Sequence, residues 1–281
     1  MNAAYQIQHP ENETLDSGQC NLYVEVAAEY LLFGILDKSR NEFTDLNYYR
    51  LDKYNTFNHL KDILYGNQLL SGSYNETRIA YHFPDCLVMP YEKYDAGLKG
   101  DMLNLVYGDL HKGDILEDSI EPGQWHAVYR VPSALHQVLT VQFPRAVFCH
   151  AYTVFLQRKS AEGQLPAGDA AFLVFYEHKL LFAFFRDAKL QMIRTFEYET
   201  AEDVTFHLLN ACRQLEADCE KIVLHISGLL DDHSSVYAEL QKYFLQTELE
   251  QRPDSFSYTS AFDEYPAHFF TSLFGIALCA L

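Results

Sequence analysis

The sequence repeats one pattern at a fixed spacing. Leu31-Leu32-Phe33 recurs as Leu180-Leu181-Phe182, and Thr56-Phe57 recurs as Thr205-Phe206. Both recurrences are 149 positions apart (31 to 180 and 56 to 205), and Leu60 and Leu209 share that spacing. Identities far apart in the chain on one spacing indicate a duplicated unit. The segments 22–64 and 171–213 therefore predict two similar lobes.

The composition fits two lobes and excludes one class of partner. A chain of 281 residues can bury two separate cores, and its 48% of hydrophobic residues, with 20 Tyr and 20 Phe, predict a globular protein. The formal net charge of −18 would repel phosphate backbones, and no stretch gathers Lys and Arg. We therefore expect no nucleic acid partner.

The cysteines and the two chain ends indicate the compartment. Six cysteines are scattered without a C-x-x-C spacing, which predicts neither a zinc site nor a disulfide framework. The stretch Met1 to Gln19 lacks the basic and apolar regions of a signal peptide. The apolar run 269–281 is too short to span a bilayer and is predicted to be a buried helix. We expect a cytoplasmic protein without a membrane partner.

The first lobe has the pattern of strands followed by a helix. Alternating or continuous apolar residues predict strands at 22–26, 30–36 and 42–51. A helix follows, capped by Asp52, with Phe57, Leu60 and Leu64 on its buried face and an end near 66–67. Further expected elements are strands at 78–83, 86–89 and 146–149 and helices at 133–141 and 150–159.

An insert interrupts this first lobe at 95–131 and has no counterpart in the second. It is predicted to contain a helix over 102–107 and a hairpin in which 114–120 pairs with 125–131 across Glu121-Pro122-Gly123. Aromatic residues supply much of the energy of contact surfaces, so Trp125, His126 and Tyr129 form a candidate partner or self-association surface. The alternative is that Trp125 covers the core of its own lobe.

The second lobe repeats the order after a linker at 160–169, which places the domains at 1–159 and 160–281. Expected strands are 170–176, 179–186, 190–199, 221–227 and 255–259. One expected helix begins at Thr200 with a capping box, and two further helices are expected at 234–246 and 268–281. The order β-β-β-α-β-α-β-α, written twice, predicts an α/β fold with mixed sheets.

This order resembles the duplicated, ribonuclease H-like lobes of the actin-like ATPase superfamily. The stretches Leu22 to Val26, Phe83 to Asp85 with Val88 to Pro90, and Trp125 to Pro132 are similar to those of an uncharacterised bacterial family assigned that fold. The resemblance implies ATP and magnesium bound between the lobes, with a D-x-G type turn between the first two strands of each lobe around the phosphates.

The corresponding turns of this chain lack glycine. They read Glu25-Val26-Ala27-Ala28-Glu29 and Phe175-Tyr176-Glu177-His178-Lys179. Glu29 and Glu177 would meet phosphate charges at a cost of about 1 kcal/mol in water and roughly 4 kcal/mol at a partly buried surface. The superfamily's Gly-Gly adenosine contact has a partial counterpart in Ser227-Gly228, for which a strand-ending turn is the alternative interpretation. The candidate nucleotide-site residues are therefore Glu25, Ala27, Ala28, Glu177, His178, Ser227 and Gly228.

Two functions of different class follow. The first is a non-catalytic binding or scaffold protein whose partner is a protein, with no cofactor. The alternative is an ATP-binding or ATP-hydrolysing protein with atypical phosphate loops. His225 and His233, near Asp231 and Asp232, could hold a divalent cation, but acidic loops are commonly just solvated, so no metal site is predicted. No catalytic motif is present, and no catalytic residue is assigned.

Overall fold

The computed structural model describes residues 2–9, 16–52, 54–121, 124–161, 165 and 167–279. The chain forms two compact units. The first comprises Met1–Arg158, Asp254–Glu264 and Gly275–Leu281, and the second comprises Lys159–Pro253 and Tyr265–Phe274. The first division lies next to the predicted boundary at 159/160. The C-terminal part differs from the prediction, because two of its segments belong to the first unit.

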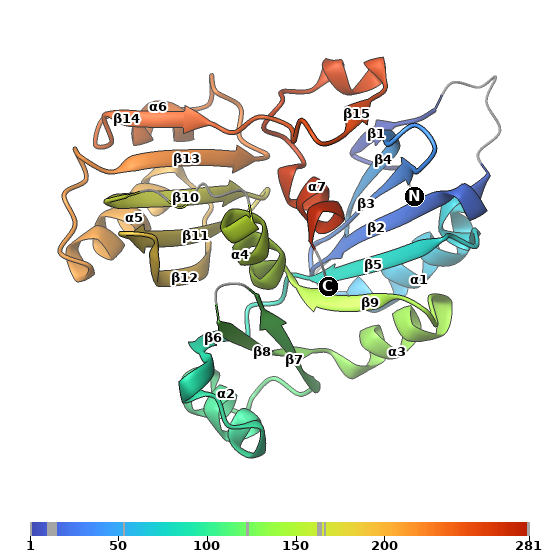
Figure 1. Ribbon diagram of the computed structural model, residues 1–281, viewed down its shortest axis with the longest axis horizontal. Coiled ribbons are helices and arrows are strands. Elements are labelled where there is room, and N and C mark those ends of the chain that lie inside the picture. Colours follow the sequence, from blue (N-terminus) through green and yellow to red (C-terminus); the bar gives the residue numbers. More distant parts are fainter. Residues whose placement is uncertain are drawn as a thin grey trace. The chain divides into compact units, whose positions relative to one another are not determined.

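The first unit is built on one mixed sheet with the order β1-β4-β3-β2-β5-β9, and β15 pairs with β4 (Figure 1). Strands β2, β3 and β4 form an antiparallel meander. Strand β5 pairs parallel with β2, and β9 pairs parallel with β5. Their bounds are β1 Tyr5–Ile7, β2 Cys20–Val26, β3 Tyr30–Asp37, β4 Glu42–Arg50, β5 Glu76–Tyr81, β9 Val147–His150 and β15 Ser257–Tyr258.

The second unit repeats this strand order as β12-β11-β10-β13-β14. Its strands are β10 Asp169–Phe175, β11 Lys179–Arg186, β12 Lys189–Glu197, β13 Val223–Gly228 and β14 Gln246–Leu249. The register of the first hairpin is also the same, since Phe33 lies opposite Val24 and Phe182 lies opposite Leu173. The prediction that the repeated Leu-Leu-Phe segments occupy equivalent central strands is confirmed.

The helices cover the sheets with apolar side chains. In the first unit Leu60, Ile63 and Leu64 of α1 are buried, whereas Phe57 is 37% exposed, so the predicted apolar face was wrong at its first position. The helices are α1 Thr56–Gly66, α3 Ser133–Gln142, α4 Ala151–Ala161, α5 Ala201–Gln214, α6 Ser235–Leu240 and α7 Thr271–Leu278. Within the described residues, no helix is long and apolar enough to cross a bilayer.

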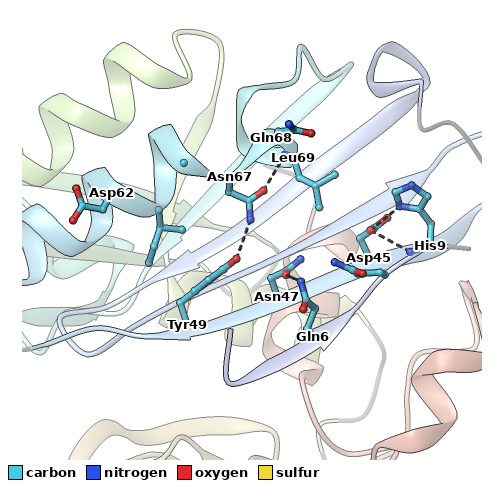
Figure 2. A pocket seen from close by; sticks show the side chains of 12 residues that line it. Gln6, His9, Asp45, Asn47, Tyr49, Asp62, Asn67, Gln68 and Leu69 are labelled. Carbon is cyan, nitrogen blue, oxygen red and sulfur yellow. Dashed lines mark hydrogen bonds and ion pairs between the residues drawn. The ribbon is translucent and has the colours of Figure 1, made fainter. Parts of the chain in front are cut away.

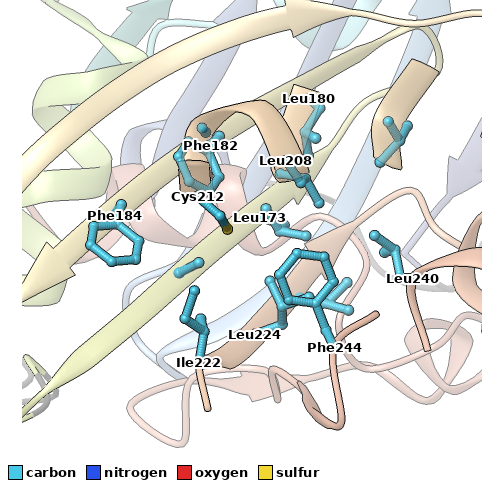
Figure 3. Packing of buried hydrophobic residues seen from close by; sticks show 14 of the residues in the cluster. Leu173, Leu180, Phe182, Phe184, Leu208, Cys212, Ile222, Leu224, Leu240 and Phe244 are labelled. Carbon is cyan, nitrogen blue, oxygen red and sulfur yellow. The ribbon is translucent and has the colours of Figure 1, made fainter. Parts of the chain in front are cut away.

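The core of the second unit shows why the predicted helix at 234–246 is wrong. Leu208 and Cys212 of α5 pack with Leu173 and Phe182 of the sheet, and Leu240 and Phe244 close the cluster (Figure 3). Helix α6 ends at Leu240, and the chain then turns into the edge strand β14. The capping box at Thr200 is confirmed, since the Thr200 hydroxyl accepts from the Asp203 amide and the Asp203 carboxylate accepts from the Thr200 amide.

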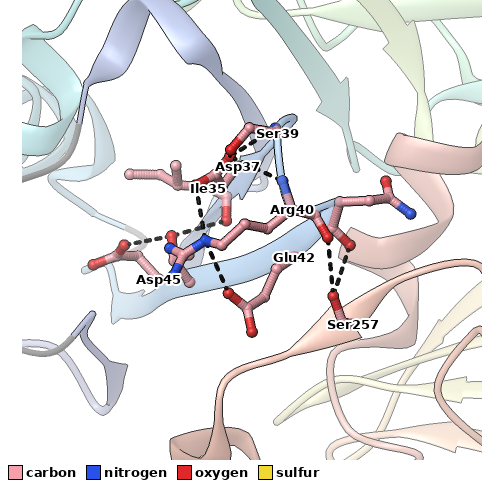
Figure 4. Close-up of polar contacts among 9 residues, drawn as sticks. Ile35, Asp37, Ser39, Arg40, Glu42, Asp45 and Ser257 are labelled. Atoms are coloured by element: carbon pink, nitrogen blue, oxygen red, sulfur yellow. Dashed lines mark hydrogen bonds and ion pairs between the residues drawn. The ribbon is translucent and has the colours of Figure 1, made fainter. Parts of the chain in front are cut away.

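The predicted fifth strand of the second lobe at 255–259 instead joins the first unit as β15. Ser257 pairs with Glu42 in parallel, and its amide donates to the Asn41 carbonyl oxygen at 2.9 Å. Ser257 Oγ lies 3.3 Å from the Arg40 carbonyl oxygen at the tip of the β3–β4 turn (Figure 4). The ring of Phe43 packs against Tyr258. This long-range pairing moves the segment into the first unit.

The insert is a three-stranded sheet, β6-β8-β7, with α2 packed on it. The predicted hairpin of β7 and β8 is confirmed, and its turn residues Pro122 and Gly123 lie outside the described residues. The insert begins at β6 and not at position 95, because β6 pairs with β8. Its elements are β6 Cys86–Pro90, α2 Lys99–Tyr107, β7 Asp114–Ile120 and β8 Trp125–Val131.

Asp118 of β7 connects the insert to the start of α4. Its carboxylate accepts from the His150 amide at 2.8 Å, from Thr153 Oγ1 at 2.6 Å and from the Tyr129 hydroxyl at 3.0 Å. Such bonds satisfy amide and hydroxyl groups at a helix N-terminus. The fully buried His150 ring donates from Nε2 to the Phe83 carbonyl oxygen, and its Nδ1 accepts from the Tyr152 amide.

Burial moves the two titrating groups of this cluster in opposite senses. It lowers the pKa of His150 from 6.5 to about 4 and raises the pKa of Asp118 from 3.8 to about 6. As pH falls from 6.5 to 4, the unfolded chain binds a proton at His150 that the folded chain does not, which lowers the free energy of unfolding. As pH falls from 6 to 3.8, the folded chain binds a proton at Asp118 that the unfolded chain does not, which raises the free energy of unfolding.

We expect His150→Gln to flatten the acid-induced loss of stability. The variant should remove at most about 3 kcal/mol of the loss in unfolding free energy between pH 6.5 and 4, because each unit of pKa shift corresponds to about 1.4 kcal/mol. Asp118→Asn should have the opposite effect and steepen the loss. The measurement is the urea unfolding free energy at a series of pH values. Three parallel pH profiles would show that neither group titrates as its burial requires.

Gly228 ends β13 where that strand lies against the backbone of β10. Its φ is +85°, and a Cβ atom would lie 2.1 Å from the Phe175 carbonyl oxygen. That oxygen accepts from the Leu229 amide at 2.8 Å, so the backbone cannot withdraw without losing a hydrogen bond. Only glycine fits this close approach.

Gly228→Ala should destabilise the second unit much more than Gly168→Ala. Gly168 has a similar φ of +94°, but a Cβ atom there would meet nothing within 4 Å. The control should therefore lose only the backbone strain of roughly 1–2 kcal/mol, whereas Gly228→Ala adds a steric clash. Thermal and urea unfolding of both variants measures the difference. Equal losses would contradict the close approach.

Candidate functional site

Glu25 lies in the buried part of β2, at the end that leads into the first hairpin turn. Its side chain is 1% exposed, and its Oε1 accepts from the Tyr30 hydroxyl at 2.9 Å. The same hydroxyl lies 2.9 Å from His82 Nδ1. Since the hydroxyl proton goes to Glu25, Nδ1 of His82 carries the proton of the second hydrogen bond. The Tyr30 hydroxyl thus links the Glu25 carboxylate to the His82 ring.

Glu25 could be recognised as unusual from the sequence, but its partners could not. A carboxylate inside a buried strand requires compensation, so a partner was to be expected. Tyr30 follows the turn and His82 follows β5, and only the folded sheet brings both to Glu25. Neither was predicted as a site residue.

The backbone of the first turn is occupied by hydrogen bonds within the unit. The Ala27 amide donates to the Tyr30 carbonyl oxygen at 3.0 Å, and Ala27 is fully buried. The Ala28 carbonyl oxygen accepts from Thr56 Oγ1 at 2.7 Å, at the start of α1. The predicted residues Glu25, Ala27 and Ala28 therefore lie at one turn, and the Ala27 amide and the Ala28 carbonyl oxygen are both bonded within the first unit.

The second turn makes the corresponding hydrogen bonds. The Tyr176 amide donates to the Lys179 carbonyl oxygen at 2.8 Å, and the Tyr198 amide donates to the His178 carbonyl oxygen at 3.0 Å. The Tyr198 hydroxyl bonds to the Tyr176 carbonyl oxygen, and burial raises the pKa of Tyr198 to about 12. Glu177 is half-buried and the His178 side chain is exposed.

Ser227 and Gly228 have structural roles in the second unit. Ser227 is 1% exposed, and its Oγ lies 3.3 Å from the Leu173 carbonyl oxygen. The Gly228 amide donates to the His268 carbonyl oxygen at 2.8 Å. The close approach to Phe175 explains the glycine, which favours the strand-ending interpretation of this pair over the adenosine contact.

The candidate partner residues of the insert divide into two kinds. Trp125 and His126 are partly exposed, and the His126 ring packs between Tyr91 and Tyr94 with centroid distances of 4.4 and 4.0 Å. Tyr129 is 1% exposed and bonds to Asp118, so it belongs to the core and not to a surface. Most residues on both faces of β8 are buried, so the alternation of its side chains does not show which of them reach the surface. The prediction that Tyr129 contributes to a partner surface was wrong for this reason.

The histidine cluster considered for a cation does not assemble a metal site. The His225 ring stacks on Phe172 and its Nδ1 lies 3.3 Å from a Glu248 carboxylate oxygen, whereas His233 is almost fully exposed. In the part of the chain that the structure describes, no group of three or more His, Cys, Asp or Glu side chains is arranged to hold a metal ion.

Solved structures share this fold. A protein of unknown function with the actin-like ATPase fold from Bacteroides thetaiotaomicron VPI-5482 has a TM-score of 0.81 and 18% identity, and the match covers 95% of this chain and 100% of that one. A chain of the PilM-PilN type IV pilus biogenesis complex has a TM-score of 0.59 and 10% identity, with 92% and 97% covered. The predicted actin-like fold is therefore confirmed.

Sequence comparison gives the family. No curated protein matches the sequence. Residues 9–246, the greater part of the chain, match the family described as protein of unknown function (DUF3822), and the chain belongs to that family.

Proposed function

We propose that this chain is a non-catalytic binding protein on an actin-like scaffold, that it acts in the cytoplasm, and that its partner is a protein. The observation that carries the proposal is the closure of both hairpin turns. Each turn lacks glycine, and the Ala27 and Tyr176 amides donate to the carbonyl oxygens of Tyr30 and Lys179 within their own turns. A phosphate cradle needs amides that point at the ligand, which glycine makes accessible.

The acidic side chains of the turns support the same conclusion. Glu25 is buried and accepts from Tyr30, so a phosphate beside it would meet the charge of a carboxylate. Glu177 adds a second carboxylate to the other turn. All six cysteines are free thiols, which fits a reducing compartment.

The alternative is an ATP-binding protein with atypical phosphate turns. It is supported by the fold, because the B. thetaiotaomicron structure is described as having an actin-like ATPase fold. It requires the turns to open on binding, with loss of the hydrogen bonds at Ala27 and Tyr176. A nucleotide titration distinguishes the two functions.

We expect no saturable change in the unfolding temperature or in the heat of titration when ATP and magnesium are added. A ligand at about 100 times its Kd would stabilise the folded protein by about 2.7 kcal/mol, which both measurements detect. Phosphate release from ATP should be the same for the wild-type protein and for Glu25→Gln, a variant that keeps an oxygen acceptor for Tyr30. Saturable binding, or magnesium-dependent turnover lost in Glu25→Gln, would establish the alternative instead.

The partner surface that we propose is formed by α2 of the insert and the residues at its two ends. Leu105 and Leu110 are each 88% exposed, Val106 is 54% exposed and Leu98 is 47% exposed. Leu105 and Val106 lie in the last turn of α2, Leu98 directly precedes the helix, and Leu110 follows its end. Exposed apolar residues gathered on one element mark interaction sites. The net charge of −18 favours a partner whose contact surface is basic around an apolar centre.

This α2 surface, formed by Leu98, Leu105, Val106 and Leu110, has a direct test. A photo-crosslinking residue at position 105, introduced in the cells that naturally contain the protein, should give one discrete protein adduct with a basic contact region. The adduct should disappear with Val106→Asp, which leaves the buried side of α2 unchanged.

A crosslinker at the exposed Gln191 of β12 is the control and should give no such adduct. A homodimeric adduct would identify a second copy as the partner and overturn the basic-partner assignment. The same adducts from positions 105 and 191, or none from either, would remove α2 as the contact surface.

A further inference from the structure

A pocket of about 460 Å³ lies over the outer part of the first unit's sheet (Figure 2). Its floor is β4, where Asp45, Asn47 and Tyr49 alternate onto one face. One wall comes from Gln6 of β1 and from Gln8 and His9, which follow that strand. The other wall comes from the end of α1 and the 3₁₀ turn η2 (Gln68–Ser71). These residues are separate from both hairpin turns.

The lining has the chemistry of a site for a neutral polar molecule. Five of its twelve residues are carboxamides, two are carboxylates, one is a histidine and one a tyrosine, and none is Lys or Arg. An anionic ligand would therefore find no cationic partner of fixed charge. Apolar side chains in the lining are confined to Ile63 and Leu69, which gives little anchorage for an apolar ligand.

Asn47 provides a hydrogen-bond donor that the described residues do not satisfy. The residue is fully buried, its Oδ1 accepts from Gln6 Nε2 at 3.1 Å, and its Nδ2 has no hydrogen-bond partner within the described chain. Buried polar groups of folded proteins are nearly always paired. A donor left over at the floor of a pocket requires an acceptor from a ligand or from solvent.

The neighbouring polar groups are held in place by the protein. Asp45 accepts from the His9 ring at 2.8 Å and from Thr44 Oγ1 at 2.8 Å, so its oxygens are already engaged. The Tyr49 hydroxyl accepts from Asn67 Nδ2 at 2.9 Å, which leaves its own proton able to donate. The floor thus offers fixed donors at Asn47 and Tyr49, a preorganised arrangement.

We propose that this pocket binds a neutral, hydroxyl-rich small molecule, a mono- or disaccharide. Hydroxyl groups both accept and donate, so they can satisfy Asn47 Nδ2 and Tyr49 while donating to the exposed carboxamide and Asp62 oxygens at the rim. The pocket volume falls within the range of small-molecule sites, and the lack of fixed positive charge excludes a phosphorylated ligand.

The test uses Gly66, which lines the pocket at the end of α1. A Cβ atom there would meet nothing within 4 Å, so the position tolerates larger side chains. Saturation-transfer NMR and calorimetry are run with glucose, galactose, N-acetylglucosamine and maltose. At least one should bind with a Kd of about 1 mM or tighter. Gly66→Trp should weaken that binding at least about tenfold by filling the space, whereas Gly66→Ala should leave it unchanged.

Two further variants make the assignment specific. Asn47→Ala should weaken binding by removing the unpaired donor, whereas Gln191→Ala, on β12 in the second unit, should not. Glucose 6-phosphate should bind more weakly than glucose. Absence of binding by every sugar, binding unaffected by Gly66→Trp, or preference for the phosphorylated sugar would each overturn the proposal.

Discussion

The central strand of each sheet is hydrogen-bonded along both edges, and the rest of each unit depends on that arrangement. In the first unit β2 pairs antiparallel with β3 and parallel with β5, and in the second β10 pairs in the same way with β11 and β13. A strand paired on both edges and covered on both faces must be apolar almost throughout. Any polar side chain within it needs a partner inside the protein, as Glu25 has in Tyr30.

The turns inherit their geometry from these strands. In the first unit the Val26 carbonyl oxygen accepts from the His82 amide, and in the second the Phe175 carbonyl oxygen accepts from the Leu229 amide. These two hydrogen bonds occupy equivalent positions in the two units, so the two hairpins have the same backbone arrangement at their ends. Since neither turn contains glycine, opening one for a phosphate would sacrifice the hydrogen bond of the Ala27 or Tyr176 amide within the hairpin. This cost is the physical basis of the proposed binding role without nucleotide hydrolysis.

The sequence predicted elements whose stabilising interactions are local. The repeated Leu-Leu-Phe segments, the capping box at Thr200 and the β7–β8 hairpin depend on neighbours within a few residues or on one turn. The sequence failed where pairing is distant. β14 reads Gln-Thr-Glu-Leu, without an apolar alternation, and β15 pairs with a strand more than 200 positions earlier. Edge strands and long-range pairs leave no local period to detect.

The candidate sites failed or succeeded for a related reason. Glu25 could be singled out from the sequence because a carboxylate stands out in an apolar strand, but its bonds to Tyr30 depend on the fold. The pocket could not be found, since its floor comes from β4 and its walls from β1 and α1. The two-residue period of a strand places Asp45, Asn47 and Tyr49 on one face of the predicted strand at 42–51. It could not show that this face was hollow.

Satisfaction of buried polar groups separates the two sites. Glu25 and Asn47 are both buried residues of the first sheet, and local hydrophobic patterning disfavours both. Glu25 receives a hydrogen bond from Tyr30, so its presence is explained by the stability of the hairpin. Asn47 keeps an unpaired amide donor beside an open volume, which stability alone does not explain. Departures from local rules concentrate at functional sites when the fold does not compensate them. The physical argument for a ligand is therefore stronger at β4 than at either hairpin turn.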